Sequence, residues 1–256
     1  MSPPSERRLL IEHIDLVDST NSELLRREPL VSADYAAVWL VARRQTAGRG
    51  RRQRTWSSAP DTSLTASLGC EVLGTGNLGL LPLLAGVAIA DALAASGVEV
   101  GLKWPNDIYR GTAKAGGILC EIRTRGPTTR MVIGCGLNLV DPPASSVPGR
   151  AVAGLFGPDA VPDRDRLAVL IGQTLFAAVL RFQEEGFEQF RLRWHARDLL
   201  RSRPIVIHDY DGERSAVAHG IDQDGALLVE SADRPGELKR LIAEEVSVRP
   251  LASPVC

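Results

Sequence analysis

The stretch QTAGRGRRQRTW, residues 45–56, joins two apolar runs, 36–42 and 63–71, that have the composition of buried strands. Six of the 30 basic residues lie between residues 43 and 54, with no acidic residue among them. Glycines on both sides of Arg49 let the backbone fold closely around a ligand, and guanidinium groups match phosphate and carboxylate oxygens in pairs. The segment therefore predicts an anion-binding loop between two strands, with a merely solvated arginine loop as the alternative.

The rest of the composition is that of an ordinary globular protein. The chain has 256 residues, with 30 Lys and Arg against 31 Asp and Glu, and 44% of it is hydrophobic. These proportions exclude a disordered chain, a collagen and a disulfide scaffold, and the length suits one large domain with or without a small one. Since the formal net charge is only -1, any electrostatic function depends on a local cluster such as the arginine loop.

Hydrophobic periodicity along residues 1–202 predicts a domain of the α+β class. Strands are expected at 11–17, 36–42, 63–71, 98–104, 118–123 and 131–139. Helices are expected from about Ser22, from Leu80 to a stop at Gly97, beyond Pro162 and along 187–194. Together these elements indicate a mixed sheet packed with helices.

Residues 203–256 have a different texture, with short alternating runs separated by turn signals. Asp211-Gly212 and Asp224-Gly225 each stand between such runs, and Asp-Gly is a strong hairpin signal. We therefore expect a second domain here, a small antiparallel β-barrel that needs to dock on the first domain because its own core is small.

Two other polar motifs interrupt the apolar pattern. KWPND at 103–107 is followed by Lys114 and by two glycines at 116–117, in a chain with only three lysines. A lysine ammonium can neutralise a phosphate or stabilise a developing oxyanion, and paired glycines let a ligand approach the backbone. DSTN at 18–21 offers donors and acceptors to a small polar ligand. The alternative interpretations are a plain turn between strands and a plain helix cap.

The cysteines and the apolar segments bear on the compartment. Cys70, Cys120, Cys135 and Cys256 have no paired spacing, which is typical of buried thiols in a reducing compartment and not of a disulfide framework or a zinc site. No apolar segment of a secretory signal follows the N-terminus. The longest apolar run, 78–95, contains glycine, proline and aspartate and favours a core helix over a membrane span. We therefore expect a cytoplasmic protein without membrane contact.

Taken together and in this order, the motifs resemble those of biotin protein ligases. The matching segments are DSTN at 18–21, QTAGRGR at 45–51, KWPND at 103–107, Lys114 with GGIL at 116–119, and GCGLNL at 134–139. Residues 220–230 also resemble the small C-terminal SH3-like domain of that family. The resemblance implies a mixed sheet like that of class II aminoacyl-tRNA synthetases and biotin synthetases in residues 1–202, and an SH3-like barrel in residues 203–256.

The resemblance implies a two-step reaction with biotin and ATP as substrates. The biotin carboxylate first attacks the α-phosphate of ATP, which gives biotinyl-5'-AMP and pyrophosphate. A lysine amine on a biotin carboxyl carrier domain of an acyl-CoA or pyruvate carboxylase then attacks this mixed anhydride. Two anions must therefore meet, so the site has to supply positive charge and to shield the adenylate from water.

The resemblance also assigns roles to individual residues. Lys114, Arg49 and Arg51 are expected to be catalytic, with both arginines on a loop that closes over the adenylate. The residues expected to bind biotin are Ser19, Thr20, Asn21, Gln45, Arg49, Gly50, Arg51, Lys114, Gly116 and Gly117. Those expected to bind ATP or the adenylate are Arg49, Arg51, Arg52, Arg54, Trp56, Asn106, Lys114 and Asn138. Mg2+ is expected to arrive with ATP, near Asp107, while His195 and His208 are expected to be structural.

The chain departs from the family pattern at three positions. Gln53 stands where relatives often carry glycine, Thr55 stands where a basic residue can occur, and Ala115 replaces the usual leucine. The smaller Ala115 side chain is expected to reshape the biotin pocket. Because only about ten residues precede the first expected strand, we also expect a short form without the helix-turn-helix domain of relatives that repress transcription.

Two other functions remain open from the residues. A lipoate ligase or octanoyltransferase is built on a related sheet and also modifies a carrier lysine, but RGR at 49–51 and KWPND at 103–107 favour biotin. A nucleic-acid-binding module would need more basic residues around the arginine loop, whereas the neighbouring runs are apolar and the rest of the chain is acidic. We therefore expect a carrier domain as the partner and no nucleic acid, with the enzyme a monomer or a homodimer.

Overall fold

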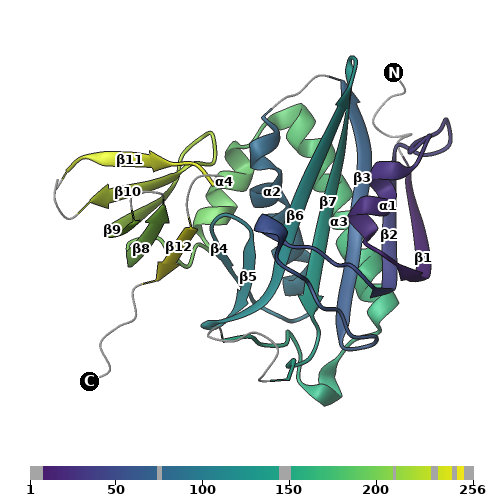
Figure 1. Ribbon diagram of the computed structural model, residues 1–256, viewed down its shortest axis with the longest axis horizontal. Coiled ribbons are helices and arrows are strands. Elements are labelled where there is room, and N and C mark those ends of the chain that lie inside the picture. Colours follow the sequence, from purple (N-terminus) through teal and green to yellow (C-terminus); the bar gives the residue numbers. More distant parts are fainter. Residues whose placement is uncertain are drawn as a thin grey trace.

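The computed structural model describes residues 8–73, 77–143, 151–209, 212–231, 236–243 and 247–250. Its larger sheet has seven strands in the order β1-β2-β3-β7-β6-β5-β4 (Figure 1). The bounds are β1 Leu9–Val17, β2 Ala37–Gln45, β3 Ser63–Leu73, β4 Gly101–Lys103, β5 Asp107–Arg110, β6 Ala113–Arg125 and β7 Thr128–Asn138. The sheet is mixed, since β1 and β2 run parallel and the other neighbours run antiparallel.

Helices cover both faces of this sheet, which explains why β2 is apolar at most positions. On one face α2 (Leu81–Ala95), α3 (Arg164–Glu185) and α4 (Glu188–His195) pack on the main core, which includes Trp39 of β2. On the other face α1 (Thr20–Arg26) packs on a smaller core with Leu40. Figure 1 shows α2 and α3 behind the sheet and α1 in front of it. The front face is the one that carries the site.

The two longest helices are apolar enough to span a membrane by length and composition alone. The apolar window at Leu78–Ala95 is 67% buried inside the protein, and a core helix of a globular protein passes the same test. The core helix predicted for this run is confirmed by its burial against the sheet and α3.

The C-terminal part forms a five-stranded antiparallel sheet in the order β11-β10-β9-β8-β12. The bounds are β8 Pro204–Asp209, β9 Gly212–Ile221, β10 Leu227–Ser231, β11 Leu238–Leu241 and β12 Ser247–Pro250. The predicted Asp224-Gly225 turn joins β9 to β10, and Gly225 has a φ of 80°, which glycine adopts without strain. Asp211 of the other predicted turn lies outside the described residues. The antiparallel sheet is confirmed, and its closure into a barrel stays a prediction.

Two elements differ from the sequence prediction. The turn predicted after Lys103 is shorter than expected, because Asp107–Arg110 forms β5, which pairs with β4 and β6. A four-residue strand is too short to show its own periodicity, so only its neighbours reveal it. Helix α1 begins at Thr20, not near Ser22, and Ser19 is its N-cap.

Candidate active site

The start of α1 forms a buried polar cluster at the front of the sheet. The Ser19 side chain accepts a hydrogen bond from the Ser22 backbone N–H at 3.5 Å and so caps the helix. The backbone N–H and the hydroxyl of Thr20 both donate to Gln45 Oε1, at 2.7 and 3.0 Å. Three of the residues predicted to bind biotin, Ser19, Thr20 and Gln45, are thus brought together from α1 and the end of β2.

Asn21 ties this cluster to the centre of the sheet. Its amide group donates to the Leu119 carbonyl at 3.1 Å and to Glu121 at 2.8 Å, and its Oδ1 accepts from the Ser67 hydroxyl at 2.6 Å. The side chain lies so close to β7 that a Cβ at Gly134 would come within 2.2 Å of Asn21 Oδ1. Asn21 therefore anchors α1 across three strands, and Gly134 has to be glycine for this contact to form.

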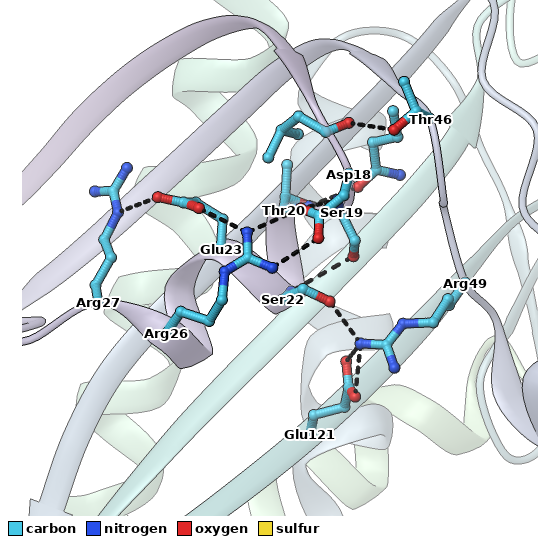
Figure 2. A network of polar contacts seen from close by, with 12 residues as sticks. Asp18, Ser19, Thr20, Ser22, Glu23, Arg26, Arg27, Thr46, Arg49 and Glu121 are labelled. Atoms are coloured by element: carbon cyan, nitrogen blue, oxygen red, sulfur yellow. Dashed lines mark hydrogen bonds and ion pairs between the residues drawn. The ribbon is translucent and has the colours of Figure 1, made fainter.

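The arginine loop is held over the same face of the sheet. Arg49 donates to the Ser22 hydroxyl at 2.8 Å and to Glu121 at 3.1 Å, as Figure 2 shows. Arg51 donates to Asn106 Oδ1 at 3.4 Å and to the Ala243 carbonyl at 2.5 Å. The loop is thereby connected to α1, to β6 and to the C-terminal part of the chain.

A cavity of about 290 Å³ lies beneath this loop. It is lined by Arg49, Gly50, Arg51, Arg52, Gln53, Leu119 and Glu121. Four residues predicted to contact substrates, Arg49, Gly50, Arg51 and Arg52, thus face one cavity, while Arg54 is exposed. Gln53 has a φ of 57°, in the left-handed region that glycine adopts without strain.

Lys114 lies over the two glycines at the start of β6. Its ammonium group forms a short ion pair with the Asp107 carboxylate, and the two side chains are only 17% and 10% exposed. A Cβ at Gly117 would lie 3.2 Å from Lys114 Nζ, and one at Gly116 would lie 2.8 Å from the Gly136 carbonyl oxygen. Both positions are thus closely packed and leave little room for a side chain, and their predicted contact with a ligand stays a prediction.

Trp56 and Asn138, two residues predicted to bind the nucleotide, make separate contacts with the protein. The Trp56 indole packs on β7, since a Cβ at Gly136 would come within 2.3 Å of the ring. Its Nε1 is buried without a hydrogen-bond partner among the described residues. Asn138, at the end of β7, donates to the Ala153 carbonyl at 3.3 Å and so holds the chain segment after the sheet. Contacts of either residue with a nucleotide stay a prediction.

Asp107 does not present a ready metal site. Its carboxylate is bonded to Lys114, and among the residues that the structure describes no three His, Cys, Asp or Glu side chains cluster as metal ligands. The Lys114 ammonium group pairs with one of the two carboxylate oxygens, Oδ1. The residues here therefore do not fit a resident metal, and Mg2+ is expected to arrive on the phosphates of ATP.

Several groups around the site have shifted pKa values. Arg26 bonds both oxygens of Asp18, which lowers the pKa of that carboxyl from 3.8 to about 2. Burial raises the pKa of the Cys70 and Cys135 thiols to about 12 and also raises the pKa of Cys120. Cys70 and Cys135 are thus the buried thiols that the sequence predicts, Cys120 is partly buried, and Cys256 lies outside the described residues.

Two groups of the site were not foreseen in the sequence. Glu121 receives hydrogen bonds from both Asn21 and Arg49, and Ser67 bonds both Thr20 and Asn21. The alternation of side chains along a strand is the signal that points to Glu121, because residues 117, 119 and 121 share one face of β6. Ser67 lies on the polar face of β3, but its partners Thr20 and Asn21 are 47 and 46 residues away, so the sequence does not reveal the contact.

Three other predicted positions lie away from the cluster. Ala115 is fully buried in the main core, so its effect on a biotin pocket stays a prediction. His195 Nε2 bonds the backbone of Ile221 at 3.0 Å, a structural contact as predicted. His208 pairs with Glu213 at 2.9 Å in the C-terminal sheet.

Comparisons of sequence place this chain among known ligases. The profile of the biotin/lipoate A/B protein ligase family matches residues 14–138. A bifunctional ligase/repressor of Escherichia coli is 33% identical over 92% of this chain and 73% of its own. Biotin–[acetyl-CoA-carboxylase] ligases of Mycobacterium tuberculosis and Paracoccus denitrificans are 32% and 33% identical, over 84% and 83% of this chain and 81% and 90% of theirs.

Solved structures share the fold over nearly the whole chain. The biotin protein ligase from Aquifex aeolicus in complex with biotin and ATP has a TM-score of 0.76 at 24% identity and covers 94% of this chain and 99% of its own. The ligase of Leishmania major in complex with biotinyl-5-AMP has a TM-score of 0.58 at 26% identity, over 94% and 100%. The predicted α+β class is therefore confirmed, and the chain belongs to the biotin protein ligase family.

Proposed function

We propose that this chain activates biotin with ATP and attaches it to a carrier protein. An oxygen of the biotin carboxylate attacks the α-phosphorus of ATP, which forms biotinyl-5'-AMP and releases pyrophosphate. The amine of a carrier lysine then attacks the acyl carbon, AMP leaves, and the nitrogen loses a proton. The observation that carries the proposal is that Lys114, Arg49 and the polar start of α1 all meet the same face of β6.

The cations of the site are already set in place by protein carboxylates. Lys114 is paired with Asp107 and Arg49 with Glu121, so both cations are held near the sheet without a substrate. Fixed positive charge of this kind stabilises the negative charge that develops as carboxylate and phosphate meet. In the proposed reaction Lys114 stabilises the reacting groups, while Arg49 and Arg51 close the loop over the adenylate, with Arg52 and Arg54 beside them.

The neutral groups supply recognition of biotin and of the nucleotide. In the proposal Ser19, Thr20, Asn21 and Gln45 read the polar head of biotin, because a buried polar cluster discriminates strongly against ligands that leave it unpaired. Gly50, Gly116 and Gly117 line the biotin site. Trp56, Asn106 and Asn138 are proposed to contact the nucleotide. Bound Mg2+ would neutralise charge on the ATP phosphates.

The proposed carrier is the biotin carboxyl carrier domain of acetyl-CoA carboxylase. Two relatives bear the name biotin–[acetyl-CoA-carboxylase] ligase, and both align over more than four fifths of their own length. We further propose that the C-terminal sheet closes as an SH3-like barrel and that the enzyme works in the cytoplasm.

Labelled-substrate transfer tests this function against the lipoate alternative. The chain is incubated with Mg-ATP, an apo carrier domain and either labelled biotin or labelled lipoate, and the label on the carrier is counted. The proposal expects ATP-dependent labelling by biotin alone. Labelling by lipoate in place of biotin would replace the proposed substrate, since the family profile includes lipoate ligases.

A further inference from the structure

Arg130 of β7 is a buried arginine that reaches the last turn of α1. Its side chain is only 7% exposed. Its Nη1 donates to the carbonyls of Leu24 and Leu25, both at 3.3 Å, and makes a short bond to the carbonyl of Arg27. The final carbonyls of a helix have no partner within the helix, so Arg130 satisfies the end of α1, together with Arg123, which donates to the Leu25 carbonyl at 3.1 Å.

The charge of Arg130 is compensated from the neighbouring strand. Glu71 lies directly opposite Arg130 in the pairing of β3 with β7. Its Oε1 accepts hydrogen bonds from Arg130 Nε at 3.0 Å and from Nη2 at 2.6 Å. A buried guanidinium without such a partner would be costly. Glu71 therefore fixes the guanidinium group of Arg130 on the sheet, and Nη1 of that group points to the helix. We call this fixed guanidinium group the Arg130 fork.

Helix α1 depends on such external contacts. It has seven residues, and a helix of this length is not stable by itself in water. Leu24, which is fully buried, holds its middle on the small core, and the hydrogen bonds of Thr20 and Asn21 hold its beginning. Arg130 holds its end through three carbonyls, one of which it shares with Arg123. Since a helix rises about 1.5 Å per residue, the Arg130 fork stands only about 10 Å from the groups proposed to read biotin.

We propose that Arg130, fixed by Glu71, is a positioning residue for biotin recognition. By holding the end of α1 it sets the position and rotation of the helix, and so the direction of Ser19, Thr20 and Asn21 at its start. It touches no substrate itself. The inference rests on the proposed function, which places biotin against these three residues.

The test separates the KM for biotin from the KM for ATP. Biotin-dependent pyrophosphate release is measured for Arg130→Met, which removes the fork but keeps a long side chain, and for Arg130→Lys, which keeps the charge. If the displaced helix start loses about one hydrogen bond to biotin, the KM for biotin is expected to rise roughly tenfold in Arg130→Met. The KM for ATP and kcat are expected to stay within about twofold of the wild type. Arg130→Lys is expected to recover part of the loss.

Arg181→Met is the matched control, because Arg181 lies on α3 in an exposed ion pair with Glu185 and shares no partner with Arg130. It is expected to leave both KM values unchanged. Far-UV circular dichroism and thermal unfolding show which variants are folded, and if Arg130→Met does not fold, Arg130→Lys alone carries the comparison. A loss of kcat with both KM values unchanged, or no change at all in an active enzyme, would overturn the positioning role. An inactive wild-type chain would instead overturn the proposed function and this inference with it.

Discussion

At the scale of single residues, Lys114 carries the heaviest part of the proposed chemistry. Lys114→Ala is expected to lower the rate of biotinyl-5'-AMP formation by about two to three orders of magnitude, since a fixed charge beside the reacting groups is lost. The rate is measured as biotin-dependent pyrophosphate release. Lys239→Ala, on β11 of the C-terminal sheet, is the matched control and should keep full activity. Wild-type release by a folded Lys114→Ala enzyme would refute the role.

Asp18 predicts a pH dependence of stability. Its pKa falls from 3.8 to about 2 in the folded protein because of Arg26, so the unfolded chain binds the proton more readily. The contribution of Asp18 is therefore complete above pH 3.8 and disappears as the pH falls to about 2. Urea unfolding across this range should show wild type and Asp18→Asn converging at low pH. Since the Asp18 side chain is 43% exposed, added salt should shrink the difference. A difference independent of pH would contradict the assignment.

At the scale of elements, the arginine loop should respond to ligands. Arg52 and Gln53 both have positive φ values, 55° and 57°, and the loop is tied down mainly by Arg49 and Arg51. Substrate anions would add contacts to the same guanidinium groups and order the loop further. Trypsin is therefore expected to cleave within residues 48–54 more slowly after biotin and ATP are added, as followed by mass spectrometry of the fragments. The same cleavage rate with and without ligands would remove the gating role of the loop.

The longer elements of the fold were predictable from the sequence, whereas many contacts between them were not. The long strands β2 and β3 and the helices α2 and α3 were predictable, because each carries a run of apolar residues long enough to show its period. The motifs that form the site were predictable as well, because they are polar segments that interrupt apolar runs. The pairing of those motifs with Glu121, Ser67 and Arg130 was not, because each of these residues bonds groups that are distant in the sequence. Register between distant strands is a property of the folded sheet and leaves no local mark in the chain.

At the scale of the whole molecule, the two sheets are joined by specific contacts as well as by the shared core. Trp104 Nε1 donates to the Gly225 carbonyl at 3.0 Å, and His195 bonds Ile221. The loop arginine Arg51 bonds Ala243, so the C-terminal part helps to hold the loop over the cavity. The arginine loop is thus held by contacts from both parts of the chain.

This arrangement gives a prediction about retention of the intermediate. Arg51→Ala should release biotinyl-5'-AMP into solution faster than the wild type, because the loop loses its contacts with Asn106 and with Ala243. Leakage is measured as free biotinyl-5'-AMP in the absence of carrier. Arg181→Ala, an exposed arginine of α3 paired with Glu185, should leak as the wild type does. Equal leakage in Arg51→Ala would mean that Arg51 does not help to seal the site.

The central claim is that this molecule joins biotin to a carrier lysine by way of an adenylate. The most direct measurement is the intact mass of an apo biotin carboxyl carrier domain after incubation with the chain, biotin and Mg-ATP. A gain of one biotinyl group per domain is expected, absent without ATP and absent when the acceptor lysine is changed to arginine. An unchanged carrier mass in the presence of folded enzyme and all substrates would contradict it.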